Sequence, residues 1–89
     1  MIGMIEIKEG NKTIWFADQK DADGYTDYLQ NGLKVIRKDG RTFYFNNGDT
    51  LIDISLPAEE NKRYILHYRN GKKATCEKLQ KRHIQAIAK

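Results

Sequence analysis

Turn signals that contain glycine divide this chain into short segments and limit it to a fold built from hairpins. They occur at Glu9-Gly10-Asn11, Asp39-Gly40, Asn46-Asn47-Gly48-Asp49 and Asn70-Gly71. Asp-Gly and Asn-Gly pairs favour two-residue hairpin turns because the central positions of such turns need a positive φ. Strand-type residues flank each signal, so the spacing predicts a mainly antiparallel sheet.

The first two pairs of strand-like segments surround two of these turns. Residues 2–8 and 12–16 predict a hairpin whose inward side chains are Ile5, Ile7, Ile14 and Phe16. Residues 33–38 and 41–46 predict a second hairpin with Asp39-Gly40 as its two turn residues. In that register Ile36 faces Phe43 and Val35 faces Tyr44. Both faces then carry apolar residues, which favours a place near the centre of the sheet.

Two later segments alternate in polarity with the period of a strand. Residues 50–56 place on one side Ile52, Ile54 and Leu56 and on the other side Leu51, Asp53 and Ser55. Residues 63–69 place on one face Tyr64, Leu66 and Tyr68 and on the other face Ile65 and His67. The Asn70-Gly71 turn returns residues 72–75 alongside, with His67 opposite Ala74.

Residues 21–30 change from the period of a strand to that of a helix. Tyr25, Tyr28 and Leu29 recur at i, i+3 and i+4, Asp21 suits the N-cap, and Gly32 suits the position after the C-cap. The pattern therefore predicts a short internal helix, although Gly24 weakens its propensity.

The C-terminal residues 76–88 also fit a helix better than a strand, because they are rich in strong helix formers. At 100° per residue one arc contains Cys76, Leu79, His83, Ala86 and Ile87. We expect this amphipathic helix to cover one face of the sheet, with Leu79, His83 and Ile87 directed inward. The predicted fold is a single α+β domain over residues 1–89, with about six short strands in hairpins, one internal helix and a C-terminal helix packed on the sheet.

Size and composition restrict the class of protein. Eighty-nine residues suit one domain with one modest core. No apolar run approaches the roughly 20 residues of a membrane span, so we expect no membrane partner. The first residues lack the basic and apolar regions of a signal peptide, and Cys76 has no second cysteine to pair with. These features favour the reducing cytoplasm.

Signals for catalysis or metal binding are weak. Asp21-Ala22-Asp23-Gly24 resembles part of a calcium loop, but Gln19 and Gln30 stand where its essential carboxylates would be. Cys76 and His67 lack a group that would orient the imidazole, and Ser55, the sole serine, has no nucleophile-elbow setting. We expect no metal, no cofactor and no enzymatic activity, with chemistry at Cys76 as the one exception.

The charge is strongly divided along the chain. Residues 62–89 contain nine basic residues and one acidic residue, whereas residues 1–61 contain seven basic and eleven acidic ones. The net charge of +4 therefore conceals a basic C-terminal third on an acidic body. A basic hairpin tip that continues into a basic helix face is suited to following a phosphate backbone.

The leading functional prediction is a non-enzymatic module that binds DNA or RNA. The residues expected to form its surface are Arg69, Lys72, Lys73, Lys78, Lys81, Arg82 and Lys89, with Tyr68 as a stacking ring. The alternative is a protein-interaction or self-associating module, in which the acidic body or an exposed sheet edge meets a protein partner or a second copy. Lysines on the solvent face of a helix are also ordinary, and Tyr64 and Tyr68 fit a core equally well.

Overall fold

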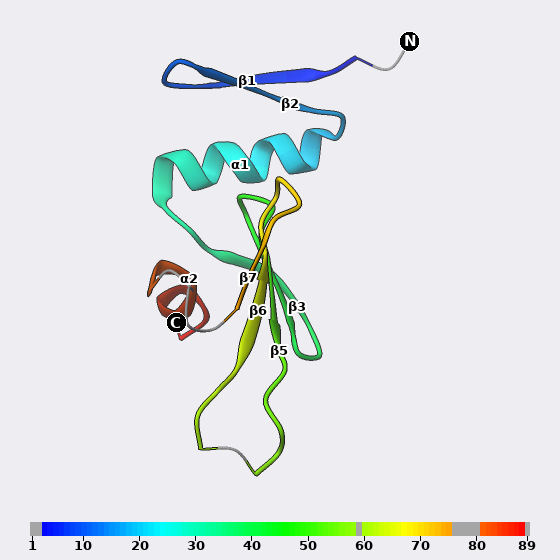
Figure 1. Ribbon diagram of the computed structural model, residues 1–89. Helices are drawn as coiled ribbons and strands as arrows, with labels where there is room; N and C mark the ends of the chain where they lie inside the picture. The colour runs from blue at the N-terminus through cyan, green and yellow to red at the C-terminus, as the bar shows by residue number, and fades with distance from the viewer. Residues whose placement is uncertain (1–2, 59, 76–80, 89) are drawn as a thin grey trace.

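The computed structural model describes residues 3–58, 60–75 and 81–88. In it seven strands form two separate antiparallel sheets, and each of two helices packs on one of them (Figure 1). The predicted α+β class is confirmed. The expectation of one sheet with about six strands is wrong, because the first hairpin does not join the other strands. It packs instead on the internal helix, which separates it from the larger sheet (Figure 1).

The N-terminal layer consists of β1 (Ile5–Glu9), β2 (Lys12–Phe16) and α1 (Gln19–Asn31). An isolated two-stranded hairpin is at best marginally stable in water, so it needs a helix against its apolar face. α1 supplies that cover through buried Ala22 and Tyr25, which pack against Phe16. The predicted inward set is confirmed, since three of its members pack around this cluster and the fourth is buried in it: Ile5, Ile7, Ile14 and Phe16.

α1 begins earlier than the sequence suggests. Asp18 has an extended backbone and its carboxylate accepts a hydrogen bond of 2.7 Å from the Lys20 N–H, so Asp18 is the N-cap. Asp21 lies in the first turn of the helix, and its predicted role as the cap is wrong. The predicted end is confirmed: Gly32 has φ +91° and its N–H donates to the Tyr28 carbonyl at 2.9 Å.

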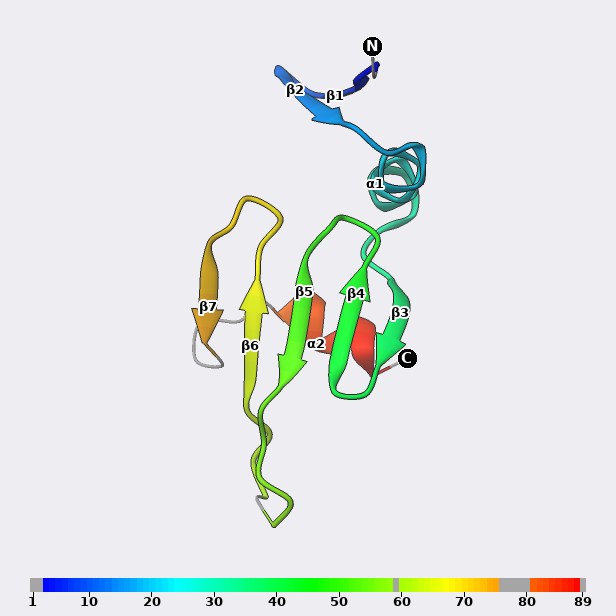
Figure 2. The same cartoon turned by 90° about the vertical axis from the view of Figure 1, so that its right-hand side faces the viewer.

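The larger sheet contains five strands in chain order, each antiparallel to the next. They are β3 (Val35–Asp39), β4 (Thr42–Phe45), β5 (Thr50–Asp53), β6 (Tyr64–His67) and β7 (Lys73–Thr75). α2 (Lys81–Ile87) lies on one face of this sheet, and Figure 2 looks onto the opposite, uncovered face.

The core of this layer lies between the sheet and α2. Phe45, Leu51 and Leu66 are buried there, with Ala86 and Ile87 of the helix packed against them. The predicted C-terminal helix is therefore confirmed over residues 81–87, with His83 fully buried and Ile87 directed at the sheet. The other residues assigned to its arc, Cys76 and Leu79, lie outside the described residues.

Two predicted registers are wrong by one residue because of where each glycine sits in its turn. Asp39 pairs with Thr42, so Gly40 and not Asp39 is the first turn residue, and Gly40 adopts φ +60°. Val35 then pairs with Phe45 and Arg37 with Tyr44, with Ile36 at a bulge between them. β3 is moreover an edge strand and not a central one.

The β6–β7 turn contains three residues instead of two, with Gly71 at φ +91° in the last position. The Tyr68 N–H donates to the Lys72 carbonyl at 2.8 Å, and the Gly71 N–H donates to the Tyr68 carbonyl at 2.9 Å. His67 consequently faces Lys73, and Ala74 faces Leu66.

Gly24 is required by a close approach between the two layers. A Cβ atom at this position would lie 2.9 Å from the backbone carbonyl oxygen of Asn46. Ala normally stabilises a helix interior by about 0.5–1 kcal/mol relative to Gly. We expect Gly24→Ala to have the opposite sign and to lower the free energy of unfolding by about 1–3 kcal/mol, because the backbone at residue 46 must move.

Urea unfolding followed by circular dichroism measures this effect. The control is Gln30→Ala at an exposed position of the same helix, which should stay within about 0.5 kcal/mol of the parent. A Gly24→Ala protein that is more stable than the parent would contradict the close approach.

Candidate functional site

The β4–β5 turn, residues 46–49, is the polar centre of the molecule. The Asn46 side chain is buried and every part of its amide is used. Its oxygen accepts from the Lys34 N–H at 3.1 Å, and its nitrogen donates to the Asp27 carboxylate at 3.1 Å and to the Gly32 carbonyl at 3.0 Å. This one amide therefore fixes the end of α1 and the start of β3 against the turn.

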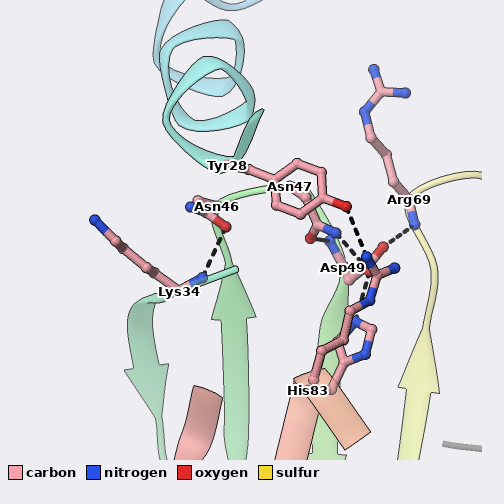
Figure 3. A network of polar contacts seen from close by, with 8 residues as sticks. Tyr28, Lys34, Asn46, Asn47, Asp49, Arg69 and His83 are labelled. Carbon is pink, nitrogen blue, oxygen red and sulfur yellow. Dashed lines mark hydrogen bonds and ion pairs between the residues drawn. The ribbon is translucent and has the colours of Figure 1, made fainter. Parts of the chain in front are cut away.

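Asp49 joins three elements through its carboxylate (Figure 3). One oxygen accepts from the Arg69 backbone N–H at 2.9 Å in the β6–β7 turn. The other lies 2.9 Å from Nε2 of His83 in α2 and 2.9 Å from the amide nitrogen of Asn47. An ionised carboxylate can only accept, so Nε2 of His83 carries the proton of that bond. Among the described residues, the Nδ1 atom of this fully buried ring has no hydrogen-bond partner.

The environment of Asp49 favours its ionised form. Burial raises the pKa of the carboxyl group, but the hydrogen bonds from His83, Arg69 and Asn47 outweigh burial and hold the pKa below the ordinary value of 3.8. The charge is thus stabilised inside the fold by donors from three chain segments.

Arg69 connects the two layers. Its guanidinium carbon lies 4.2 Å from the centre of the Phe16 ring, and the same group donates to the Trp15 carbonyl at 3.2 Å. Its methylene groups pack on Gly48, where a Cβ atom would lie 3.0 Å away. A stacked guanidinium with its stem against glycine is a structural contact.

A cleft of about 370 Å³ opens where the two layers meet, above the uncovered face of the sheet. Its walls come from the end of β2, the first turns of α1, the bulge of β3, the β4–β5 turn and the β6–β7 turn. Residues that border it include Trp15, Lys20, Asp21, Ile36, Tyr44 and Thr50. The volume lies within the range of about 300–1,000 Å³ found for small-molecule sites.

The four predicted basic residues whose side chains the structure describes do not lie in one strip. Lys72 and Lys73 are exposed at the β6–β7 turn, and Lys73 lies on the uncovered sheet face by alternation from Ala74. Arg82 lies on the helix side and donates to the Tyr28 hydroxyl at 2.9 Å. Arg69 is engaged between the layers as described. Of the remaining predicted lysines, Lys78 and Lys89 lie outside the described residues, and of Lys81 only the backbone, at the start of α2, is described.

Tyr68 occupies the covered side of the sheet. Its ring is half-buried and lies 6.3 Å from the His83 ring at a near-perpendicular angle, within the core under α2. Tyr64 packs in the same cluster. Both rings therefore contribute to the core of the larger layer.

The uncovered face carries residues that the basic C-terminal segment did not indicate. The alternation places there Arg37, Tyr44, Thr50, Ile52, His67 and Lys73. The Arg37 guanidinium carbon lies 4.2 Å from the centre of the Tyr44 ring. The sequence signal was available, because Tyr44 stands between the inward residues Phe43 and Phe45.

Comparisons with protein-family models, with curated proteins and with solved structures find no match for this chain. In the described residues no group of three or more His, Cys, Asp and Glu side chains is placed to hold a metal ion. No helix within the described ranges has the length and apolar character needed to cross a membrane.

The Asp49 bonds make stability dependent on acid. Because the folded pKa of Asp49 is lowered, its contribution is fully present above the ordinary value of 3.8 and is lost as the pH falls through the lower folded value. We expect Asp49→Asn to cost about 2 kcal/mol or more at pH 7 and to flatten the decline of stability between about pH 4 and 2.

Urea midpoints measured from pH 7 down to about pH 2 test this expectation. Asp39→Asn, at the exposed end of β3, is the matched control and should leave both stability and its acid dependence close to the parent. An Asp49→Asn protein with the parent's acid profile would show that Asp49 does not contribute in this way.

Proposed function

We propose that this protein is a non-enzymatic nucleic-acid-binding module whose basic residues on the larger sheet contact phosphates. The observation that carries the proposal is the way charge follows the two layers. Residues 1–32, which include the N-terminal layer, contain three basic and six acidic residues. Residues 33–75, which include the five-stranded sheet, contain nine basic and five acidic ones.

Exposed cations at both edges of the uncovered face support this proposal. Arg37 lies on β3 at one edge, and Lys73 lies on β7 at the other, with Lys72 beside it. Neither Lys72 nor Lys73 forms an ion pair with a described residue, so both charges face solvent and are available to anions. Such a distribution favours salt-dependent association with a polyanion.

Replacing Lys72 and Lys73 together by Glu tests the proposal. We expect the affinity for DNA or RNA at low salt to fall by about tenfold or more, because two phosphate contacts become repulsive. The slope of log affinity against log salt should become shallower by roughly 0.7–0.9 for each lost contact. Fluorescence anisotropy of a labelled oligonucleotide over a series of salt concentrations measures both quantities.

Lys8→Glu combined with Lys12→Glu is the matched control, since it changes the net charge equally but on the acidic N-terminal layer. This protein should bind almost as the parent does, after circular dichroism has verified its fold. Equal losses in both double variants would indicate a response to net charge alone, and no binding by the parent at low salt would refute the proposal.

Exposed apolar side chains favour a second candidate, a protein-interaction or self-associating module. Trp15 is 51% exposed, Ile36 58% and Leu56 61%. The edges of the larger sheet are poorly suited to adding a strand, because β3 is bulged and β7 has three residues and carries Lys73. In this second candidate, the protein therefore associates through exposed side chains and not by pairing of sheet edges.

Sedimentation velocity over a range of concentrations tests self-association. If the second candidate holds, the sedimentation coefficient should rise with concentration, and Leu56→Glu should abolish the rise. Leu56 is exposed beyond the end of β5, so this variant should fold normally. A parent protein that remains monomeric at the highest concentration would exclude the self-associating form.

A further inference from the structure

We infer that the uncovered face binds a single, unpaired nucleic-acid strand, with one base entering the cleft between the layers and stacking on Tyr44. This inference rests on the proposed function and adds the class of nucleic acid and the place where a base is held.

Tyr44 offers an aromatic ring on the uncovered face. It lies on β4, the strand next to the β3 edge, and it borders the cleft. The Arg37 guanidinium carbon lies over one face of this ring, 4.2 Å from its centre, so a base would stack on the other face or take the place of Arg37. A base stacked on an aromatic ring strengthens binding by about five- to a hundredfold whatever its identity, because every base has a π-face. His67 and Lys73 extend the face toward β7.

The cleft lies at one end of this face and is partly open to solvent. Trp15 and Ile36 supply exposed apolar walls, and Lys20 stands at its border without an ion pair to any described residue. The polar groups at its floor are already satisfied, since Asn46 and Asp49 spend their hydrogen bonds inside the protein. A ligand is therefore held by ring contacts and by cations at the rim, which suits a base with its attached phosphate.

The surroundings of the cleft favour one strand over a duplex. A paired base is stacked between its neighbours and presents only its edges, so its ring face is not available to Tyr44. The N-terminal layer stands over one end of the sheet (Figure 1), and Asp21 of α1 borders the cleft next to Lys20. A duplex brings two phosphate backbones near this carboxylate and a single strand brings only one, so Asp21 disfavours the duplex more strongly.

Fluorescence anisotropy with three labelled probes tests the inference. The probes are a thymidine strand of about a dozen nucleotides, the uridine strand of equal length, and the thymidine strand annealed to its complement. We expect one or both single strands to bind at least about tenfold more tightly than the duplex, and the comparison of thymidine with uridine separates DNA from RNA. Trp15, the sole tryptophan, borders the cleft, so its emission should change as the same strand saturates the protein.

Substitutions at Tyr44 identify the stacking ring. Tyr44→Leu should weaken single-strand binding by about five- to a hundredfold, whereas Tyr44→Phe keeps the ring and should bind within about twofold of the parent. Urea midpoints of both variants verify that the sheet is intact. Leu retains an apolar side chain on the strand, so a specific loss of binding reports on stacking.

The outcomes separate this inference from the proposed function. Equal binding of duplex and single strand, or an unchanged affinity in Tyr44→Leu, overturns the inference. The proposed function still holds in that case if the Lys72 and Lys73 variant shows the expected salt-dependent loss of affinity. An unchanged Trp15 emission at saturation would show that no base enters the cleft and would overturn that part of the inference. Absence of binding to every probe at low salt overturns both. Displacement of the strand by an acidic tyrosine-containing peptide that binds more tightly would make the face a protein surface and would also overturn the inference.

Discussion

The larger layer depends on the hydrogen bonds that the buried Asp49 carboxylate accepts. Burying a charge costs several kcal/mol unless the charge is fully hydrogen-bonded, and here three donors converge on two oxygens. They come from the β4–β5 turn, the β6–β7 turn and α2. Over the described residues α2 has seven residues, and a helix of that length is not stable by itself in water. The hydrogen bond from His83 to Asp49 therefore fixes the position of α2 on the sheet. The apolar contacts of Ala86 and Ile87 are not directional and would fix that position less closely.

The β4–β5 turn also helps to connect the two small cores of the molecule. A chain of this size buries a modest apolar surface, and this one divides that surface between a cluster under α1 and a cluster under α2. Polar and cation–π contacts join them: Asn46 holds the end of α1, and Arg69 lies on Phe16. The molecule is accordingly elongated, 50 Å by 26 Å by 24 Å, with the cleft at the junction.

The periodicity of the sequence predicted whether nearly every described element is a helix or a strand. It could do so because apolar side chains recur with the period of the element wherever one face is buried. Register was not accessible in the same way. It depends on whether Gly40 is the first or the second turn residue and on whether the turn at Gly71 holds two residues or three. Those choices follow from backbone φ angles and from the bulge at Ile36, none of which changes the hydrophobic pattern of the flanking segments.

Charge counts along the chain were a weaker guide to the site, because a basic residue is available to a partner only when the fold does not use it. Arg69 spends its guanidinium on Phe16 and on the Trp15 carbonyl, and Arg82 donates to Tyr28, so two of the expected cations join the layers. Arg37, outside the basic third, lies beside an outward ring on the uncovered face. The bulge in β3 and Lys73 on β7 also disfavour the addition of a strand at either edge of that sheet.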